Sequence, residues 1–127
     1  MTVRYVFDTG ALISAERRKQ RAIRFLRLVR AGRARILVPL PVVAEWWRGR
    51  TDAREQILAA AEVISSVAIA KAAGVALAGV RDVDAKLTID AVVMATAAFM
   101  DAVVITGDPR DLESFSRYFP GVVVLAA

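Results

Sequence analysis

The segment Val3-Arg-Tyr-Val-Phe-Asp-Thr-Gly10 joins a strand-like run to a turn, and the same pattern returns along the chain. β-Branched and aromatic residues fill Val3–Asp8, which predicts a strand that ends at the turn residues Thr9-Gly10. Later strands are predicted on similar grounds at Ile36–Pro39, Val63–Val67, Ala102–Thr106 and Val122–Leu125. The runs are continuously apolar rather than alternating, which is typical of parallel strands covered on both faces.

Helices are predicted between these strands. Gln20–Ala31 carries apolar side chains on one face and arginines on the other. Pro41 suits the first turn of a helix that carries Glu45, and Thr51 is predicted to cap the next helix. Further helices are predicted over Ala68–Val80, from an N-cap at Thr88 to Met100, and from Asp108 to about Tyr118, with Arg81–Leu87 as a loop. This alternation predicts one α/β domain over residues 1–127, a central parallel sheet of about five strands with helices on both faces.

The composition of the chain limits the chemistry available to it. Its 127 residues are 57% hydrophobic and include no cysteine and no histidine. Disulfides, thiolate nucleophiles, a zinc site of sulfur and imidazole, and a Ser-His-Asp triad are therefore excluded. The oxygen ligands that remain suit hard ions such as Mg²⁺ or Mn²⁺. No secretory signal or membrane-spanning run is visible, so we expect a cytoplasmic protein.

Four carboxylates stand where a parallel sheet would bring them together. Asp8 ends the first strand and Asp108 follows the fourth, with Asp111 close behind. Glu45 and Asp90 are predicted to open helices that follow strand-side loops. Because functional groups gather beyond the carboxyl ends of parallel strands, all four acids are expected at one edge of the sheet. Such a cluster repels itself unless a positive charge lies among the acids, which predicts a divalent cation site.

Each acid also has a purely structural explanation. Asp8 suits a turn, Asp90 after Thr88 suits the dipole of a helix, Asp108 suits an N-cap, and Glu45 suits a solvated helix face. The joint pattern favours the metal site. Glu45 and Asp90 are flanked by apolar residues, where an unpaired charge is costly.

The charge balance of the chain points in the same direction. The net charge is +5 and the isoelectric point is about 10.4. A basic surface would attract a polyanion, and an acidic pocket would hold the metal that acts on it. A coding bias toward arginine and alanine explains the charge equally well.

Four motifs of the chain resemble those of a known family. They are Phe7-Asp-Thr-Gly-Ala-Leu-Ile13, Val43-Ala-Glu-Trp-Trp-Arg-Gly49, Thr88-Ile-Asp-Ala-Val-Val-Met-Ala-Thr-Ala97 and Val104-Ile-Thr-Gly-Asp-Pro-Arg-Asp-Leu112. In this order and spacing the chain resembles PIN-domain ribonucleases, and more narrowly the VapC toxins of type II toxin–antitoxin systems. The family often carries Ser or Asn two residues after the first Asp, where this chain has Gly10.

The resemblance implies a fold, an activity and partners. The fold is the three-layer PIN domain, and the activity is that of a Mg²⁺- or Mn²⁺-dependent endoribonuclease that hydrolyses RNA through metal-activated water. The implied partners are RNA, a cognate antitoxin and a second copy of the chain in a homodimer. The implied catalytic and metal-binding residues are Asp8, Glu45, Asp90 and Asp108. Thr106 and Asp111 are candidate supporting residues.

Arginines dominate the segment that follows the first motif. Arginine suits bidentate contact with phosphate, which predicts binding of RNA or of an acidic antitoxin segment. A solvated helix face is the alternative. The residues concerned are Arg17, Arg18, Arg21, Arg24 and Arg27. The pair Trp46-Trp47 suits base stacking, although a place in the core or an interface is favoured.

This chain lacks residues that other enzymes with a similar sheet require. A receiver-like domain needs an aspartate at the end of the third strand, and Val63-Ile-Ser-Ser-Val67 offers none. A dehalogenase-type phosphatase needs an aspartate where Gly10 stands. A nucleotide-binding fold needs a Gly-rich phosphate loop, and the sequence contains none. The remaining alternative is a catalytically silent PIN domain that binds RNA or a protein. Cleavage of RNA by the purified protein distinguishes the two.

Overall fold

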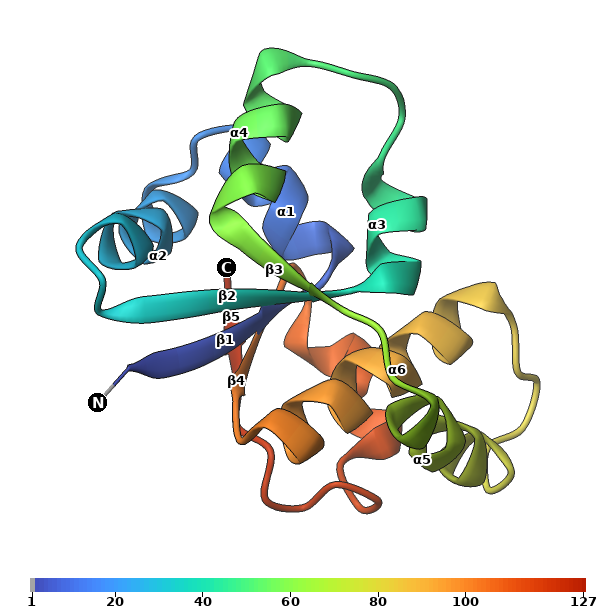
Figure 1. The fold of residues 1–127 in the computed structure, drawn as a ribbon. Coiled ribbons are helices and arrows are strands. Elements are labelled where there is room, and N and C mark those ends of the chain that lie inside the picture. Colours follow the sequence, from blue (N-terminus) through green and yellow to red (C-terminus); the bar gives the residue numbers. More distant parts are fainter. Residues whose placement is uncertain (1) are drawn as a thin grey trace.

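Parallel strands form the central layer of the protein (Figure 1). The computed structural model describes residues 2–127, and in that range five strands build one sheet in the order β3-β2-β1-β4-β5. All neighbouring strands are parallel. Their bounds are β1 Val3–Phe7, β2 Ala34–Pro39, β3 Ala61–Ile64, β4 Val103–Thr106 and β5 Val124–Ala126.

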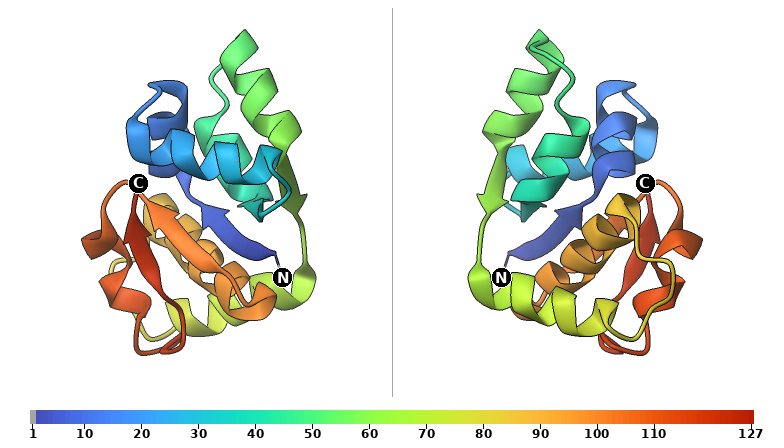
Figure 2. Two further views of the ribbon diagram at one scale, coloured as in Figure 1. Left: turned by 90° about the vertical axis from the view of Figure 1, so that its left-hand side faces the viewer. Right: turned by 90° about the vertical axis from the view of Figure 1, so that its right-hand side faces the viewer.

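Helices cover both faces of this sheet, as Figure 1 and the two side views of Figure 2 show. One layer consists of α1 Thr9–Glu16, α2 Gln20–Arg30, α3 Leu40–Trp46 and α4 Asp52–Ala60. The other consists of α5 Val67–Leu77, α6 Ala85–Met100 and the 3-10 helix η1 Pro109–Phe115. The predicted α/β architecture with a parallel five-stranded sheet is confirmed. No helix in residues 2–127 combines the length and the apolar character needed to cross a membrane.

The core lies on both sides of β1 and β4. Val6, Phe7, Val104 and Ile105 have no exposed surface, which accounts for the continuous apolar runs in the sequence. Burial of each large side chain of this kind contributes about 1.5–3 kcal/mol. The two central strands are therefore fixed firmly, and so are the residues that follow them.

The strand order places a crevice beside β1. The chain proceeds from β1 to β2 and β3 in one direction, and then returns to place β4 on the other side of β1. Phe7 pairs with Ile105, so Asp8 and Thr106 are neighbours at the carboxyl ends of the two strands. A reversal of strand order of this kind is where open α/β sheets bind ligands.

Several predicted elements are present with shifted ends. β3 begins at Ala61 and ends at Ile64 instead of covering Val63–Val67, and the next helix begins at Val67. Ser66 caps that helix, and its hydroxyl accepts a hydrogen bond from the Ile69 N–H at 3.2 Å. β5 begins at Val124 rather than at residue 122, and the last predicted helix is a 3-10 helix that ends at Phe115.

The prediction that Thr88 caps the helix before Asp90 is wrong. Asp84 is the N-cap of α6, and its carboxylate accepts a hydrogen bond from the Leu87 N–H at 2.8 Å. The Thr88 hydroxyl lies inside the helix and donates to the carbonyl of Asp84. Asp90 therefore lies in the second turn of α6, and the predicted loop over Arg81–Leu87 is partly helical.

Glu45 also does not open a helix. α3 begins at Leu40, directly after β2, with Pro41 in its first turn. The helix is short and ends at Trp46, so Glu45 lies in its last turn. The side chain still reaches the carboxyl edge of the sheet, because α3 packs on α1 there.

Candidate active site

A pocket at the carboxyl edge of β1 and β4 gathers all the acids singled out from the sequence. Its wall includes the carboxylates of Asp8, Glu45, Asp90, Asp108 and Asp111. These residues come from the junction of β1 and α1, from α3, from α6 and from the start of η1, which are distant in sequence. The parallel strands bring them together as predicted, while their catalytic role stays a prediction.

Asp8 both caps a helix and lines the pocket. It is the N-cap of α1, where its Oδ1 accepts a hydrogen bond from the Ala11 N–H at 2.9 Å. Its Oδ2 accepts from the hydroxyl of Thr106. Burial raises the pKa of the Asp8 carboxyl and Glu45 adds to the rise, whereas the bonds from Thr106 and Ala11 lower it. The two oxygens of Asp8 are thereby held in a fixed orientation.

Thr106 links the two acids that follow the central strands. Besides its bond to Asp8, its Oγ1 accepts a hydrogen bond from the Asp108 N–H at 3.2 Å. Asp108 in turn caps η1 by accepting from the Arg110 N–H at 3.0 Å. That bond lowers the pKa of Asp108, with help from the Arg110 side chain. The pKa of Asp108 is therefore shifted in the opposite direction to the pKa values of Asp8 and Asp90, and Asp108 ionises more readily than either.

Glu45 is positioned by a residue that sequence reasoning missed. The hydroxyl of Thr9, the residue next to Asp8, donates to Oε1 of Glu45. Thr9 lies in the first turn of α1 and Glu45 in the last turn of α3, so this bond joins the two helices across the pocket. Its place inside the first motif was the signal that could have identified it.

Asp90 has the most perturbed environment of the acids. Its side chain is buried, and among the described residues its Oδ2 is the one buried side-chain polar atom without a hydrogen-bond partner. Burial raises the pKa of Asp90 to about 7. Lys86 opposes this rise, whereas Asp8, Asp111 and Glu45 add to it. An unpartnered buried carboxylate oxygen is costly unless something positive binds to it.

Lys86 is the second pocket residue that sequence reasoning missed. Its Nζ lies 2.8 Å from Oδ2 of Asp111, which joins the first turn of α6 to η1. The bond from Asp111 raises the pKa of Lys86, and Asp90 and Asp108 contribute to the same rise. Lys86 was missed because a loop was predicted over Arg81–Leu87. In the structure α6 begins at Ala85, so Lys86 and Asp90 lie on one face of this helix.

The glycine that departs from the family pattern has a steric explanation. A Cβ atom on Gly10 would lie 2.8 Å from the Cα atom of Gly107 and 2.9 Å from its backbone nitrogen. Real Cβ atoms do not approach backbone atoms so closely. The start of α1 and the loop after β4 therefore pack backbone to backbone, and a side chain at position 10 would force apart Asp8 and Asp108.

The donor set of the pocket fits a hard divalent cation. It offers carboxylate and hydroxyl oxygens, which Mg²⁺ and Mn²⁺ prefer, and no sulfur or imidazole. The free Oδ2 of Asp90 is a ready ligand. In residues 2–127, no three acidic side chains already stand in an arrangement that would hold one ion. Metal binding would accordingly require rotation of one or more of the carboxylates.

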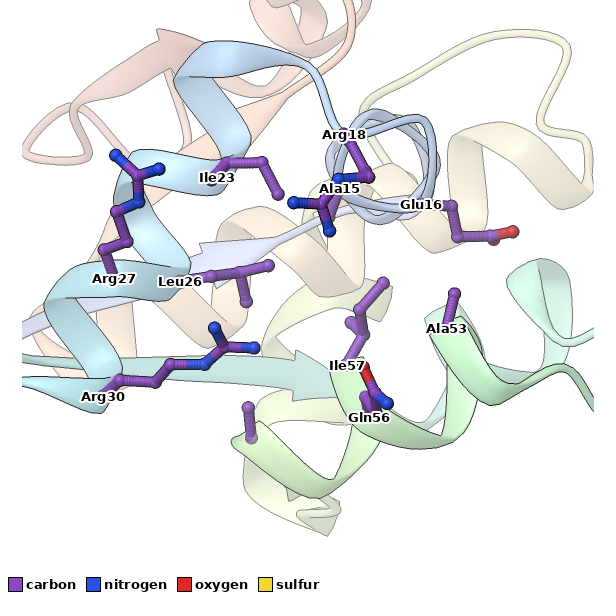
Figure 3. A pocket seen from close by; sticks show the side chains of 11 residues that line it. Ala15, Glu16, Arg18, Ile23, Leu26, Arg27, Arg30, Ala53, Gln56 and Ile57 are labelled. Atoms are coloured by element: carbon purple, nitrogen blue, oxygen red, sulfur yellow. The ribbon is translucent and has the colours of Figure 1, made fainter.

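The predicted basic residues occupy a different place. Arg17, Arg18, Arg21, Arg24 and Arg27 are exposed on α2 and the turn before it. A groove between α1, α2 and α4 has an apolar floor that includes Leu26 and Ile57, with Arg18, Arg27 and Arg30 around it (Figure 3). None of its residues lines the acidic pocket.

The two tryptophans belong mainly to the packing of α3. Trp46 is buried, and its indole N–H donates to Glu16, which also binds Arg54 at 3.2 Å. Trp47 is half-buried and packs edge-to-face on Trp46 with ring centroids 5.9 Å apart. The preference for a core position over base stacking is confirmed for Trp46.

Comparisons with known proteins agree with this geometry. Comparison with curated protein sequences gives no match. Among solved structures, VapBC2 from Rickettsia felis bound to a DNA fragment from their promoter gives a TM-score of 0.70 at 17% identity, over 98% of this chain and 99% of that one. DNA-bound VapBC from Salmonella typhimurium gives 0.63 at 18% identity, over 98% of each chain. PAE2754 from Pyrobaculum aerophilum gives 0.57 at 18% identity, over 98% and 92%.

At identities of 17–18%, similarity to these solved structures shows a shared fold only. The family itself is identified by the sequence profile of the PIN domain, which matches residues 5–118. The match includes every acid of the pocket, from Asp8 to Asp111. The chain therefore belongs to the PIN-domain family.

Proposed function

We propose that this protein is a metal-dependent endoribonuclease of the VapC type, the toxin of a toxin–antitoxin pair. One observation carries the proposal: five carboxylates converge at the carboxyl edge of the sheet, and one of them has a buried oxygen that no group in residues 2–127 bonds. A purely structural cluster of acids would satisfy that oxygen with a hydrogen bond or an ion pair. The PIN-domain membership and the fold similarity to VapBC structures support the same assignment.

The acids would divide the work according to their surroundings. Asp8, Asp90 and Asp108 would hold Mg²⁺ or Mn²⁺ at the ends of β1 and β4. A bound ion of this kind polarises a phosphodiester and lowers the pKa of water. Glu45, oriented by the hydroxyl of Thr9, would orient the attacking water or complete the ligand set. Thr106 would keep Asp8 in place, because it binds that carboxylate directly.

The decisive test is cleavage of total cellular RNA by purified, antitoxin-free protein. Reactions with Mg²⁺, Mn²⁺ and EDTA would be compared for the wild type, Asp8→Asn and Asp52→Asn. Asp52 is an exposed acid on α4 and serves as the matched control. We expect discrete fragments that require metal, persist in Asp52→Asn and disappear in Asp8→Asn. Folded wild-type protein that cleaves no RNA in either metal would reject the nuclease and favour the catalytically silent binding module.

The groove between α1, α2 and α4 is the proposed binding site of the antitoxin. Leu26 and Ile57 offer it an apolar floor, and Arg18, Arg27 and Arg30 offer three positive charges (Figure 3). A segment that alternates apolar and acidic side chains complements such a surface. The RNA phosphate is the competing partner for the arginines of α2.

Co-expression with a candidate antitoxin tests the antitoxin assignment, and a small DNA-binding protein, if one is encoded beside this gene, is the first candidate to try. Replacement of Arg18, Arg27 and Arg30 by Gln is expected to weaken the complex, whereas Asp8→Asn leaves it intact. The same triple variant is then titrated with RNA. A complex of unchanged affinity, together with weaker RNA binding and a flatter salt dependence, would assign these arginines to RNA instead.

The proposed homodimer would use the apolar surface where α3, α5 and α6 meet. Leu40 is 51% exposed and Val67 is 74% exposed there, beside a depression lined by Pro41, Ile69 and Val92. Exposed apolar side chains around a depression are typical of an interface. Light scattering is expected to give the mass of a dimer, and Leu40→Asp is expected to give that of a monomer. A monomeric wild type at micromolar concentration would reject this dimer.

A further inference from the structure

Lys86 is the one basic side chain among the described residues that line the acidic pocket. It lies in the first turn of α6, one helical turn before Asp90 and on the same face. Its ammonium pairs with Asp111 at 2.8 Å, across the gap between α6 and η1. The positive charge is therefore placed at the mouth of the pocket, beside the carboxylates rather than on the outer surface of the helix.

The ion pair leaves this charge available to a ligand. The Lys86 side chain is 63% exposed, and that of Asp111 is 40% exposed. Exposed ion pairs contribute little to stability, because water and salt screen both charges. A phosphate oxygen can therefore replace Asp111 as the partner of the ammonium at small cost, while the long lysine side chain follows the ligand.

The pocket also needs such a charge. The carboxylates of the pocket repel a phosphodiester, and the metal that they would hold neutralises only part of their charge. A fixed cation beside the metal site lowers the repulsion where the RNA backbone must enter. Asp90 and Asp108 are close enough to Lys86 to raise its pKa, so the ammonium stays charged beside them.

We propose that Lys86 is the substrate-positioning residue of this site, and that it contacts a phosphate of the RNA backbone next to the bond that is cut. In the free protein Asp111 holds the ammonium at the mouth of the pocket. On binding, the phosphate takes the place of Asp111, and the scissile group is brought over Asp8, Asp90 and Asp108. This inference rests on the proposed nuclease function.

RNA affinity in the absence of cleavage provides the test. A fluorescein-labelled single-stranded RNA of mixed sequence is titrated in EDTA and in Ca²⁺ with the wild type, Lys86→Gln, Lys86→Arg and Lys71→Gln. Lys71 is an exposed lysine on α5 and is the matched control. Lys86→Gln is expected to weaken binding about 5- to 20-fold and to flatten the slope of log affinity against log salt by about 0.7. Lys86→Arg should restore most of the affinity, and Lys71→Gln should match the wild type.

A further variant tests whether phosphate replaces Asp111 as the partner of Lys86. Asp111→Asn removes the partner that competes with phosphate, so it is expected to bind RNA in EDTA as tightly as the wild type or more tightly. Loss of RNA affinity in Asp111→Asn would contradict the replacement of Asp111 by phosphate. Unchanged affinity and salt slope in Lys86→Gln would overturn the phosphate contact and leave an ion pair that only joins α6 to η1. Equal losses in Lys86→Gln and Lys71→Gln would overturn it as well, because they would indicate unspecific attraction.

The two proposals fail in different ways. Cleavage of total RNA by the wild type in Mg²⁺ is recorded beside each titration and reports on the nuclease alone. A protein that cleaves RNA with unchanged binding in Lys86→Gln keeps the nuclease and rejects the role of Lys86. A protein that never cleaves, but whose RNA affinity depends on Lys86, rejects the nuclease and retains Lys86 as an RNA contact. For an active protein, Lys86→Gln should raise KM more than it lowers kcat, as expected of positioning through binding.

Discussion

At the scale of single residues, Asp90 makes the stability of the protein depend on pH. Its folded-state pKa of about 7 lies above the ordinary value of 3.8, mainly because the carboxyl is buried. Between these values the folded state keeps a proton that the unfolded state has lost. The stabilisation from protonated Asp90 is thus complete below the ordinary pKa and disappears as the pH rises through about 7.

Asp90→Asn should remove this dependence, because the amide stays neutral. At about pH 8 the variant is expected to be more stable than the wild type by roughly 1–3 kcal/mol, measured as the free energy of unfolding in urea without metal. The advantage should vanish near pH 4. Asp101→Asn is the control, since asparagine tolerates the left-handed conformation of that exposed position (φ 50°). An Asp90→Asn variant less stable than the wild type at about pH 8 would contradict the argument.

The contact between Gly10 and Gly107 gives a second prediction at this scale. Gly10→Ala would place a methyl group 2.8 Å from the Gly107 Cα atom, and backbone cannot rotate away as a side chain can. We expect destabilisation of about 1–3 kcal/mol in thermal or urea unfolding, together with loss of the proposed nuclease activity as the β4 loop shifts. Gly74→Ala is the matched control: nothing lies within 4 Å of its Cβ position in α5. It should be neutral or stabilising by up to about 1 kcal/mol. Equal stabilities for the two variants would contradict the close approach.

The residues of the site differ in how far sequence could identify them. Asp8 and Asp108 follow apolar strands, so the edge where they meet was predictable from strand direction alone. Thr9 and Lys86 were not predicted, because each acts on an acid from another element. Contacts between α1 and α3, or between α6 and η1, depend on packing that a motif does not encode.

At the scale of elements, the start of α6 decides whether Lys86 reaches the pocket. Asp84 and Thr88 are both residues that cap helices well, and sequence reasoning preferred the second. The structure begins the helix at Ala85, and this additional turn half-buries Leu87. The helix after β3 likewise begins where Ser66 caps it, after a loop whose length the apolar pattern does not determine.

Capping variants separate these two interpretations of α6. Asp84→Ala removes the bond to the Leu87 N–H and is expected to cost about 1 kcal/mol of unfolding free energy. Thr88→Ala removes only a hydroxyl that bonds inside the helix, and its cost should stay below about 0.5 kcal/mol. Urea unfolding of both variants against the wild type provides the measurement. A larger loss in Thr88→Ala would place the start of the helix where the sequence pattern suggested.

At the scale of the whole molecule, a bound metal should stabilise the fold, because its ligands come from elements that lie together only in the folded chain. Asp8, Asp90 and Asp108 are distant in sequence, and the unfolded chain offers no comparable site. At free metal of about 100 times Kd, linkage adds about 2.7 kcal/mol. For a chain of this length that corresponds to a rise in Tm of roughly 10 °C.

The rise in Tm on metal binding should depend on pH, and the pKa of Asp90 sets the direction of this dependence. Below its pKa of about 7 the metal must displace a proton from that carboxyl, so the shift in Tm is expected to be smaller near pH 6 than near pH 8. Mg²⁺ and Mn²⁺ would be compared with NaCl at equal ionic strength by circular dichroism. Asp90→Asn should lose most of the shift, and Asp101→Asn should keep it. A Tm that neither metal moves at any pH would remove the basis for a metal site. A shift of equal size in Asp90→Asn would instead show that the ion is not bound by Asp90, whose buried Oδ2 has no hydrogen-bond partner among the described residues.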